Sequence, residues 1–305
     1  MKFWVGVTDN NWYDFLSRLK PEEVNFWQPG GSQVFRAVDQ FAPFLFKLHH
    51  PDNYIAGGAF FVKHSFLPLS FAWETFGQKN GTPDFETLRK KITAKRKDSA
   101  SDPTIGCILL AQPFFFPREE WIPAPEDFSK NIVQGKTYDM RDATGAHLWN
   151  QVRERLDRAH VILEEQTAEE PARYGNPVLI NPRIGQDIFR VLVTDAYSRR
   201  CAISGEKTLP VLQAAHIKPY AESGPHKIEN GLLLRADMHI LFDKGYLTIT
   251  PDFYTEVSKR IETNFQNGKE YYKFHGKRLE VLPIQQKEKP SADFLRWHNE
   301  HRFIA

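Results

Sequence analysis

The sequence predicts an α+β protein in which a strand-rich N-terminal domain precedes a C-terminal domain built from a hairpin and a helix. Three observations lead to this fold class. A chain of 305 residues is long enough for two domains of ordinary size. A content of 41% hydrophobic and 26% charged residues is typical of a folded chain. Short apolar runs between Pro, Gly and Asn dominate up to about residue 140, and helical spacing becomes prominent only after it.

The N-terminal domain, residues 1–140, is expected to consist mainly of strands. Four apolar runs have the length and the flanking residues of strands: 3–7, 44–48, 55–62 and 105–110. Only one long helix is expected here, over 84–97, with Pro83 at a first-turn position.

Residues 141–182 are expected to form a helix followed by a linker. Apolar residues recur at helical spacing from Gly145 to Glu165. Residues 166–182 contain Glu169-Glu170-Pro171 and several later prolines and glycines, as linkers do. The second domain is then expected over 183–305, and it begins with a helix that ends near Cys201.

Charge and composition exclude several classes of protein. The formal net charge of +2 is weaker than that of proteins that hold nucleic acid by charge alone, so any positive surface must be local. No apolar run has the roughly 18 residues of a membrane span, and the N-terminus lacks the pattern of a signal peptide, which predicts a cytoplasmic protein. Two cysteines, Cys107 and Cys201, agree with a reducing compartment and exclude a four-cysteine zinc site.

The clearest chemical signal lies in the C-terminal domain, where His216, Asn230, His239 and Asp243 follow one another within a short stretch. Residues 211–217 and 232–234 read as strands, with Asn230-Gly231 as a tight turn between them. Asp237 is expected to cap the following helix, which leads to a strand over 246–250. His239 and Asp243 then lie one helical turn apart on the same face and can chelate a divalent cation. A histidine on the facing strand can take a proton from water, which indicates phosphodiester hydrolysis.

These residues resemble the HNH (ββα-metal) endonucleases, in particular a restriction-type branch with an Ala-His-Ile motif, here Ala215-His216-Ile217. The resemblance extends over 183–305. The following residues also carry it: Gly185-Gln186, Phe189-Arg190, Tyr197, Arg200-Cys201-Ala202, Ser204-Gly205, His275 to Leu279, Phe294-Leu295 and Trp297-His298.

The resemblance implies a ββα-metal fold with catalytic residues His216, Asn230 and His239. His216 would be the general base, and Asn230 would orient this base, brace the hairpin or contact the metal. His239 and Asp243 would bind the metal. Many members of the family place a second ligand directly before the base, where this chain has Ala215, so Asp243 or a carboxylate from elsewhere must complete the ligand set. One histidine and one carboxylate leave room for water, which favours Mg²⁺ or Mn²⁺ over a closed zinc site.

Several residues around the motif have open alternatives. His216 could be a satisfied core histidine, Asn230 a simple turn residue, and Asp243 a brace for the loop that follows. Lys218, Arg235 and Lys244 could bind DNA phosphates, with ordinary surface charge as the alternative. Two further side chains are expected to have no chemical role: His226, exposed in a Gly-Pro loop, and Cys201, which packs in the core.

The N-terminal domain resembles, more faintly, the PUA-type domains that hold a modified base flipped out of the duplex. Strands joined by glycine-rich loops with aromatic side chains carry this resemblance, and Trp27 and Trp73 are the candidates for base recognition. The alternative for each is a place in the core. The basic run between Arg89 and Lys97 could follow a DNA backbone or form a solvated helix face.

The sequence therefore predicts a metal-dependent DNA endonuclease of restriction or defence type, whose partner is double-stranded DNA, including DNA with modified cytosine. One HNH site cuts one strand, so a double-strand break predicts a homodimer or two successive nicks. Two alternatives stay open. One is an effector nuclease activated by a small nucleotide or a partner protein, and the other is an inactive HNH fold that only binds nucleic acid.

Overall fold

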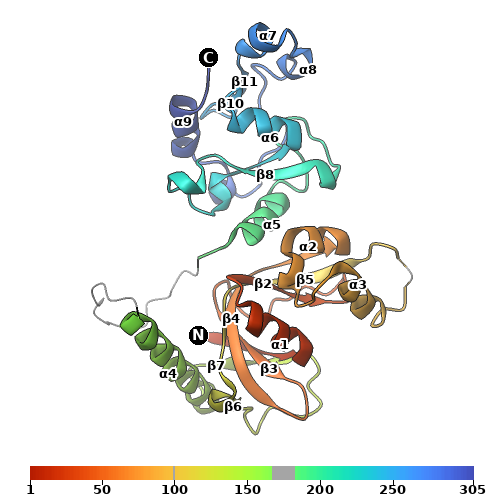
Figure 1. Ribbon diagram of the computed structural model, residues 1–305, viewed down its shortest axis with the longest axis vertical. Helices are drawn as coiled ribbons and strands as arrows, with labels where there is room; N and C mark the ends of the chain where they lie inside the picture. Colours follow the sequence, from red (N-terminus) through yellow and green to blue (C-terminus); the bar gives the residue numbers. More distant parts are fainter. Residues whose placement is uncertain (99, 167–182) are drawn as a thin grey trace. The chain divides into compact units, whose positions relative to one another are not determined.

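The computed structural model describes residues 1–98, 100–166 and 183–305, except for the side chains of 159–166. The chain forms two compact units, Met1–Arg183 and Ile184–Ala305, called here the N-terminal and the C-terminal unit (Figure 1). The linker predicted over 166–182 lies outside the described residues beyond Gln166. Within the described ranges, no helix combines the length and the apolar character that a membrane crossing requires.

The N-terminal unit is built on one mixed sheet. Its strands are β1 (Lys2–Thr8), β2 (Glu23–Gln28), β3 (Pro43–Leu48), β4 (Tyr54–Pro68), β5 (Thr104–Phe115), β6 (Ile122–Pro123) and β7 (Gly135–Asp139). They lie in the order β2-β5-β4-β3-β1-β7, with β6 paired to β4. Only β1 and β3 run parallel, and every other neighbouring pair is antiparallel. The four predicted strands are all present in this sheet.

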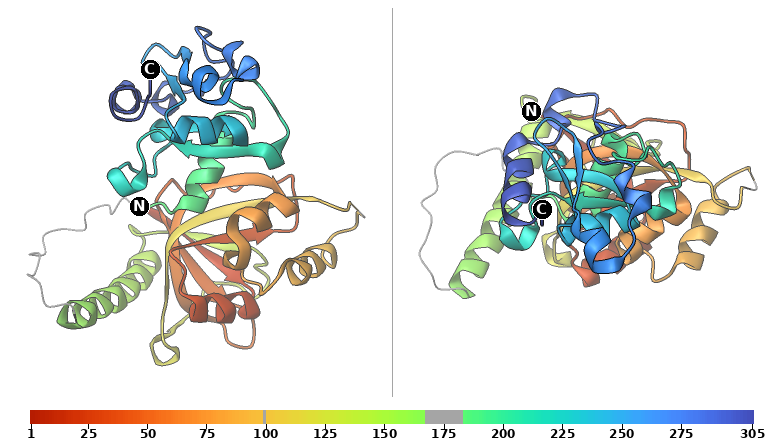
Figure 2. Two further views of the ribbon diagram at one scale, coloured as in Figure 1. Left: turned by 45° about the horizontal axis from the view of Figure 1, so that its top comes forward. Right: turned by 90° about the horizontal axis from the view of Figure 1, so that it is seen from above.

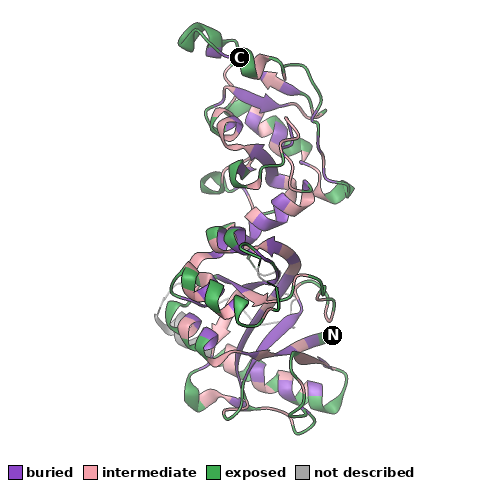
Figure 3. Cartoon of the chain, turned by 90° about the vertical axis from the view of Figure 1, so that its right-hand side faces the viewer, coloured by how far each residue is buried: buried purple, intermediate pink, exposed green. Residues whose placement is uncertain are grey.

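Both faces of this sheet are buried because its central strands are apolar on each side. Phe44 and Phe46 of β3 pack with Leu16 of helix α1 (Asn10–Leu19) on one face. Leu45 points to the other face, where it packs with Leu148 of helix α4 (Ala143–Gln166). Figure 3 shows this burial along the strands. The helix predicted after residue 141 thus packs on the N-terminal sheet.

The helices of this unit are more numerous than the sequence indicates. The predicted helix over 84–97 is α3 (Phe85–Thr93), where the Asp84 side chain accepts a hydrogen bond from the Thr87 amide at 2.7 Å. Helix α1 and helix α2 (Leu69–Phe76) were not predicted. Both are rich in aromatic side chains, which favour strands locally, so the expectation of one long helix in this part of the chain was wrong.

The C-terminal unit centres on a short hairpin covered by helices (Figure 2). Its elements are α5 (Gln186–Ala196), β8 (Leu212–His216), β9 (Gly231–Arg235), α6 (Ala236–Asp243), β10 (Leu247–Ile249), β11 (Thr255–Val257), α7 (Arg260–Phe265), α8 (Lys269–Tyr272) and α9 (Ala292–His301). Strands β8 and β9 are antiparallel, with His216 opposite Gly231. Phe189 of α5, Leu233 of β9 and Phe242 of α6 share one core. This confirms the predicted α+β class, with a hairpin-plus-helix arrangement in the C-terminal unit.

Candidate functional site

His216 ends strand β8 and lies at the edge of the core. Alternation along the strand sends its neighbours Ala215 and Ile217 into the interior, where both are fully buried. The His216 ring stacks on Phe189 with centroids 4.0 Å apart and planes at 12°. Its Nε2 lies 2.9 Å from Nδ1 of His226. Because the methyl side chain of Ala215 has no donor atom, the position before the histidine offers no side-chain ligand to a metal.

Burial, and then the neighbouring His226 and His239, lower the pKa of His216 to about 4. The ring is therefore uncharged at neutral pH, and one of its nitrogens carries a lone pair. An uncharged imidazole is what a general base needs at the start of a reaction. Helix α6 contacts the strand that carries His216, since His239 of α6 lies against Gln213 of β8.

Asn230 is fully buried and braces the loop between the two strands. Its Oδ1 accepts a hydrogen bond from the Lys218 amide at 2.9 Å. Its Nδ2 donates to the carbonyl oxygens of Lys218 at 2.9 Å and Pro225 at 3.0 Å. These bonds connect the start of the loop, at Lys218, to its end, at Asn230. The Asn230 side chain therefore braces the hairpin. The turn at this point is a short 3₁₀ segment, Ile228–Asn230.

His239 and Asp243 lie on the same face of α6, as their spacing predicts. His239 Nε2 is 3.3 Å from Asp243 Oδ2. On the other side of the ring, Nδ1 lies 2.8 Å from Oε1 of Gln213 on strand β8. An amide oxygen only accepts, so this contact places the proton of a neutral His239 on Nδ1 and leaves the Nε2 lone pair toward Asp243. Gln213 thus favours the tautomer in which Nε2 of this histidine could bind a metal.

These donors fit a divalent cation with an open coordination shell. Two ligands on adjacent positions of an octahedral Mg²⁺ or Mn²⁺ site would be about 3.0 Å apart, given metal–ligand bonds of about 2.1 Å. The His239–Asp243 separation of 3.3 Å is close to that value. No cluster of three or more His, Cys, Asp or Glu is found among the described residues. The remaining positions would be left to water and phosphate oxygens, which suits Mg²⁺ or Mn²⁺ better than a closed zinc site.

The three candidate DNA-binding cations differ in their surroundings. Lys244 is exposed at the end of α6. Lys218 lies with its Nζ 5.5 Å from the ring centre of Trp297, and Arg302 lies 5.9 Å from the same ring. Both cations therefore share one tryptophan near the start of the loop that Asn230 braces. Arg302 was not predicted, because its position depends on packing of the C-terminal helix.

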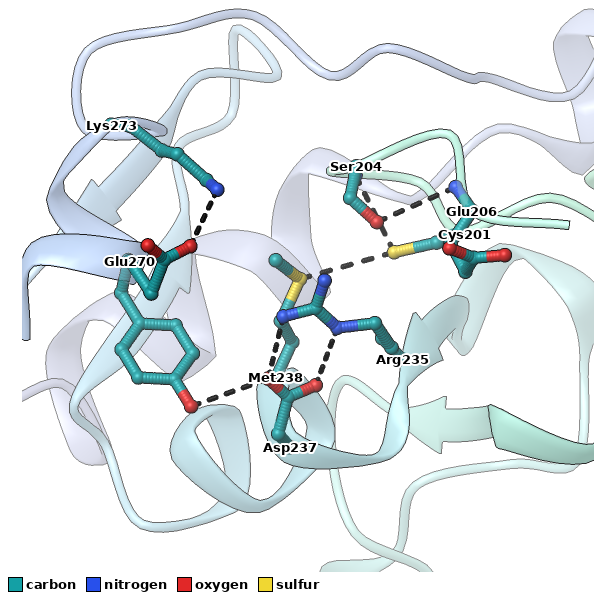
Figure 4. A network of polar contacts seen from close by, with 9 residues as sticks. Cys201, Ser204, Glu206, Arg235, Asp237, Met238, Glu270 and Lys273 are labelled. Carbon is teal, nitrogen blue, oxygen red and sulfur yellow. Dashed lines mark hydrogen bonds and ion pairs between the residues drawn. The ribbon is translucent and has the colours of Figure 1, made fainter. Parts of the chain in front are cut away.

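Arg235 is instead held by a carboxylate. Its Nε and Nη2 donate to Asp237 at 2.7 and 2.6 Å, and Tyr271 donates to the same carboxylate at 3.2 Å. Figure 4 shows this pair beside Cys201 and Met238. The predicted N-cap role of Asp237 is wrong: Arg235 is the N-cap residue of α6, and Asp237 lies in the first turn and pairs with it. Cys201 is fully buried in the core, as expected.

The two tryptophans proposed for base recognition are both partly buried. Trp27 donates from Nε1 to the carbonyl oxygen of Asn80 at 2.9 Å, and Lys95 Nζ lies 5.6 Å from its ring centre. Trp73 lies 6.2 Å from Phe85, ring centre to ring centre. These two side chains contact different residues. A role in recognition therefore stays a prediction.

Two residues near the site escaped the sequence interpretation. Gln213 faces α6 only because of how the hairpin packs on that helix. Its distance in sequence from His239 does not predict this contact. His226 was expected to be exposed and without a role, but it is half-buried and contacts His216. Its sequence position in a Gly-Pro loop concealed this contact, because the path of a loop cannot be read from periodicity.

The C-terminal geometry agrees with a family comparison. Residues 201–250 match the family model described as HNH endonuclease. This stretch is an HNH endonuclease domain. It contains β8, β9, α6 and β10, and with them the four residues of the motif. The resemblance predicted from these residues is thereby confirmed for this part of the chain.

Comparison with solved structures returned weaker likenesses. Two crystal structures of an ASCH protein from Zymomonas mobilis, one of them of a point mutant, match at 10% and 11% identity with a TM-score of 0.35. They cover 48% and 49% of this chain and 94% and 98% of theirs, on the strand-rich half for which the sequence predicts a PUA-like domain. The modification-dependent restriction endonuclease TagI matches at 17% identity and a TM-score of 0.28, over 92% of this chain and 75% of its own. No curated protein sequence matches the chain.

Proposed function

We propose that this protein is a metal-dependent DNA endonuclease of restriction or defence type that acts in the cytoplasm. One observation carries the proposal: within the HNH domain, an uncharged His216 lies on strand β8, and helix α6, which contacts this strand, carries a His239–Asp243 pair that fits a divalent cation. A base and a cation site on one hairpin-plus-helix unit are the two parts that phosphodiester hydrolysis needs.

In this proposal His216 accepts the proton of the attacking water. Asn230 keeps the loop in place and thereby the end of the strand that carries His216. His239 and Asp243 hold Mg²⁺ or Mn²⁺, and Gln213 keeps His239 in the binding tautomer. When bound, such a cation polarises the phosphate and neutralises the departing 3′-oxygen. Lys218 and Lys244 would bind backbone phosphates, whereas Arg235 would need to leave Asp237 to do so.

The N-terminal unit would choose the double-stranded DNA substrate, and we propose modified cytosine as the feature that it senses. Trp27 and Trp73 would contribute through stacking on a flipped base. Since one HNH site cuts one strand, double-strand cleavage would need a homodimer or two successive nicks. Sedimentation on DNA separates these cases, because a monomer that makes concerted double-strand breaks contradicts the dimer.

Cleavage assays test the proposal directly. Plasmid and phage DNAs, unmodified and with methylated, hydroxymethylated or glucosylated cytosine, would be incubated with Mg²⁺ or Mn²⁺ and with a chelator. Metal-dependent cutting that is lost in His216→Ala is the expected result. Cutting of modified DNA alone assigns base sensing to the N-terminal unit. Cutting that begins only after a small nucleotide or a partner protein is added would identify an effector nuclease instead.

A binding protein without nuclease activity is the second candidate. Ala215 favours it, because this fully buried residue leaves the helix pair His239 and Asp243 without a third ligand from the strand. Tight DNA binding without cleavage of any substrate, in the presence of either cation, would support this candidate over the nuclease.

A further inference from the structure

The loop between β8 and β9 brings a second histidine to the general-base candidate. His226 Nδ1 lies 2.9 Å from His216 Nε2, and the two rings meet edge to face with centroids 4.9 Å apart and planes at 63°. Phe189 covers one face of the His216 ring at 4.0 Å. The ring is thus held at a face and at one edge, which leaves it little freedom to rotate.

The backbone around His226 is anchored on both sides. On one side, the Gly224 amide donates to the Pro219 carbonyl at 3.0 Å. A Cβ at Gly224 would lie 1.9 Å from the Lys218 carbonyl oxygen, so only glycine fits this close approach. Directly before His226, Asn230 Nδ2 also donates to the Pro225 carbonyl at 3.0 Å. On the other side, the Asn230 amide donates to the Lys227 carbonyl at 2.9 Å. The contact between the two histidines is therefore a consequence of the braced loop path.

The His226 ring is also held by stacking. Tyr220 lies parallel to it, with centroids 4.4 Å apart and planes at 13°. Tyr220 is 63% exposed, so this stack forms the outer side of the row of rings Phe189, His216, His226 and Tyr220.

A hydrogen bond between two imidazoles needs a proton on one nitrogen and a lone pair on the other. It therefore makes the tautomer of each ring depend on that of the other, and it fixes the plane of both. We propose that His226 is a positioning residue: its Nδ1 accepts a hydrogen bond from Nε2–H of His216 and thereby leaves the lone pair on His216 Nδ1 to accept a proton from water. The catalytic meaning of this inference rests on the proposed nuclease function, whereas the structural part does not.

Two variants separate the hydrogen bond from the packing. His226→Phe keeps a ring that can stack on Tyr220 but removes both nitrogens. His226→Asn removes the ring but keeps a polar atom near the place of Nδ1. If the hydrogen bond matters, the asparagine variant retains function and the phenylalanine variant loses it. A purely structural role would give the opposite order.

The experiment uses the full chain with isotope-labelled histidine and records the ring nitrogens of His216 by NMR, together with steady-state cleavage and DNA affinity. In the wild type, His216 should show one tautomer with a hydrogen-bonded Nε2. His226→Phe should average the tautomers and lower kcat by roughly 10-fold or more while DNA affinity stays within about twofold. His226→Asn should keep the wild-type tautomer and most of the rate.

Either of two results overturns the inference: His216 nitrogen signals that do not change in His226→Phe, or a His226→Phe enzyme that cuts as fast as the wild type. A wild-type protein that cuts no DNA while its His216 signals respond to His226→Phe as expected refutes the nuclease function and leaves the positioning contact established. The two failures are thereby distinguishable.

Discussion

Two histidines of the C-terminal unit share a depressed pKa but have different surroundings. Burial lowers the pKa of His298 to about 4, as it does for His216. His298 lies on α9, 2% exposed, and stacks on Phe242 with centroids 3.7 Å apart, much as His216 stacks on Phe189. The two histidines differ in the hydrogen-bond partners of their ring nitrogens. His298 Nε2 faces the Phe242 carbonyl at 3.1 Å and Nδ1 faces the Thr248 hydroxyl at 2.8 Å.

This comparison shows that a depressed pKa does not by itself identify a general base. Both ring nitrogens of His298 are occupied by groups that do not titrate near neutral pH, so the ring connects α9 to the strand and helix beneath it. His216 is paired with another imidazole and lies on the strand that contacts His239 of α6. Perturbed titration is informative only together with the partners of the group.

The largest effect is expected for His216→Ala. Removing a general base lowers the cleavage rate by about 10²- to 10⁴-fold. Plasmid cleavage in Mg²⁺ or Mn²⁺ measures it, with thermal melting to show that the variant is folded. His298→Ala serves as the matched control and should cut at the wild-type rate at a temperature where it is folded. Equal losses of cleavage rate in the two variants would contradict the view that His216 has a catalytic role and His298 a structural one.

The second effect concerns stability, for which we expect a larger loss in His298→Ala than in His216→Ala. His298→Ala should lower the free energy of unfolding by about 2–4 kcal/mol, because it opens a cavity and leaves the Phe242 carbonyl without its partner. His216 lies at the edge of the core, so His216→Ala should cost clearly less. Urea unfolding measures both. A larger loss for His216→Ala would show that its ring is mainly a packing element.

Gln213→Ala tests the histidine of the helix. Loss of the group that orients a metal-binding histidine lowers metal affinity by roughly 10- to 100-fold. Titration of Mn²⁺ into the protein measures this without any need for cleavage. Gln213→Glu is the control, since it keeps an oxygen that accepts from His239 Nδ1 and should retain affinity. An unchanged affinity in Gln213→Ala would contradict the role of Gln213.

The smallest effect is a dependence of stability on pH. For both histidines the pKa in the folded state, about 4, lies below the ordinary value of 6.5, so the unfolded chain binds more protons between these values. Stability should be constant above the ordinary value and fall as the pH decreases through this window, by about 1 kcal/mol for His298 at pH 5.5. Urea midpoints between pH 7 and 5 measure the slope. If stability depends on pH equally in the wild type and in His298→Asn, His298 does not contribute to this dependence.

Local sequence patterns were sufficient for the motif and for much of the sheet. Alternation places His216 at the end of a strand with Ala215 buried, and a spacing of one helical turn places His239 beside Asp243. Both results depend only on the geometry of a single element. The same holds for the four apolar strands of the N-terminal unit. Helices α1 and α2 were missed because their aromatic residues have a local preference for strands that tertiary packing overrides.

Only the tertiary structure decided which side chains meet across elements. Gln213 contacts His239 because the hairpin packs on α6, and His226 reaches His216 because Asn230 and Gly224 determine the path of a loop. Arg235 turns toward Asp237 for a similar reason. Periodicity describes how side chains repeat within one helix or strand. It carries no information about the closure of a loop or the contact of two elements, where the partners of each candidate residue are chosen.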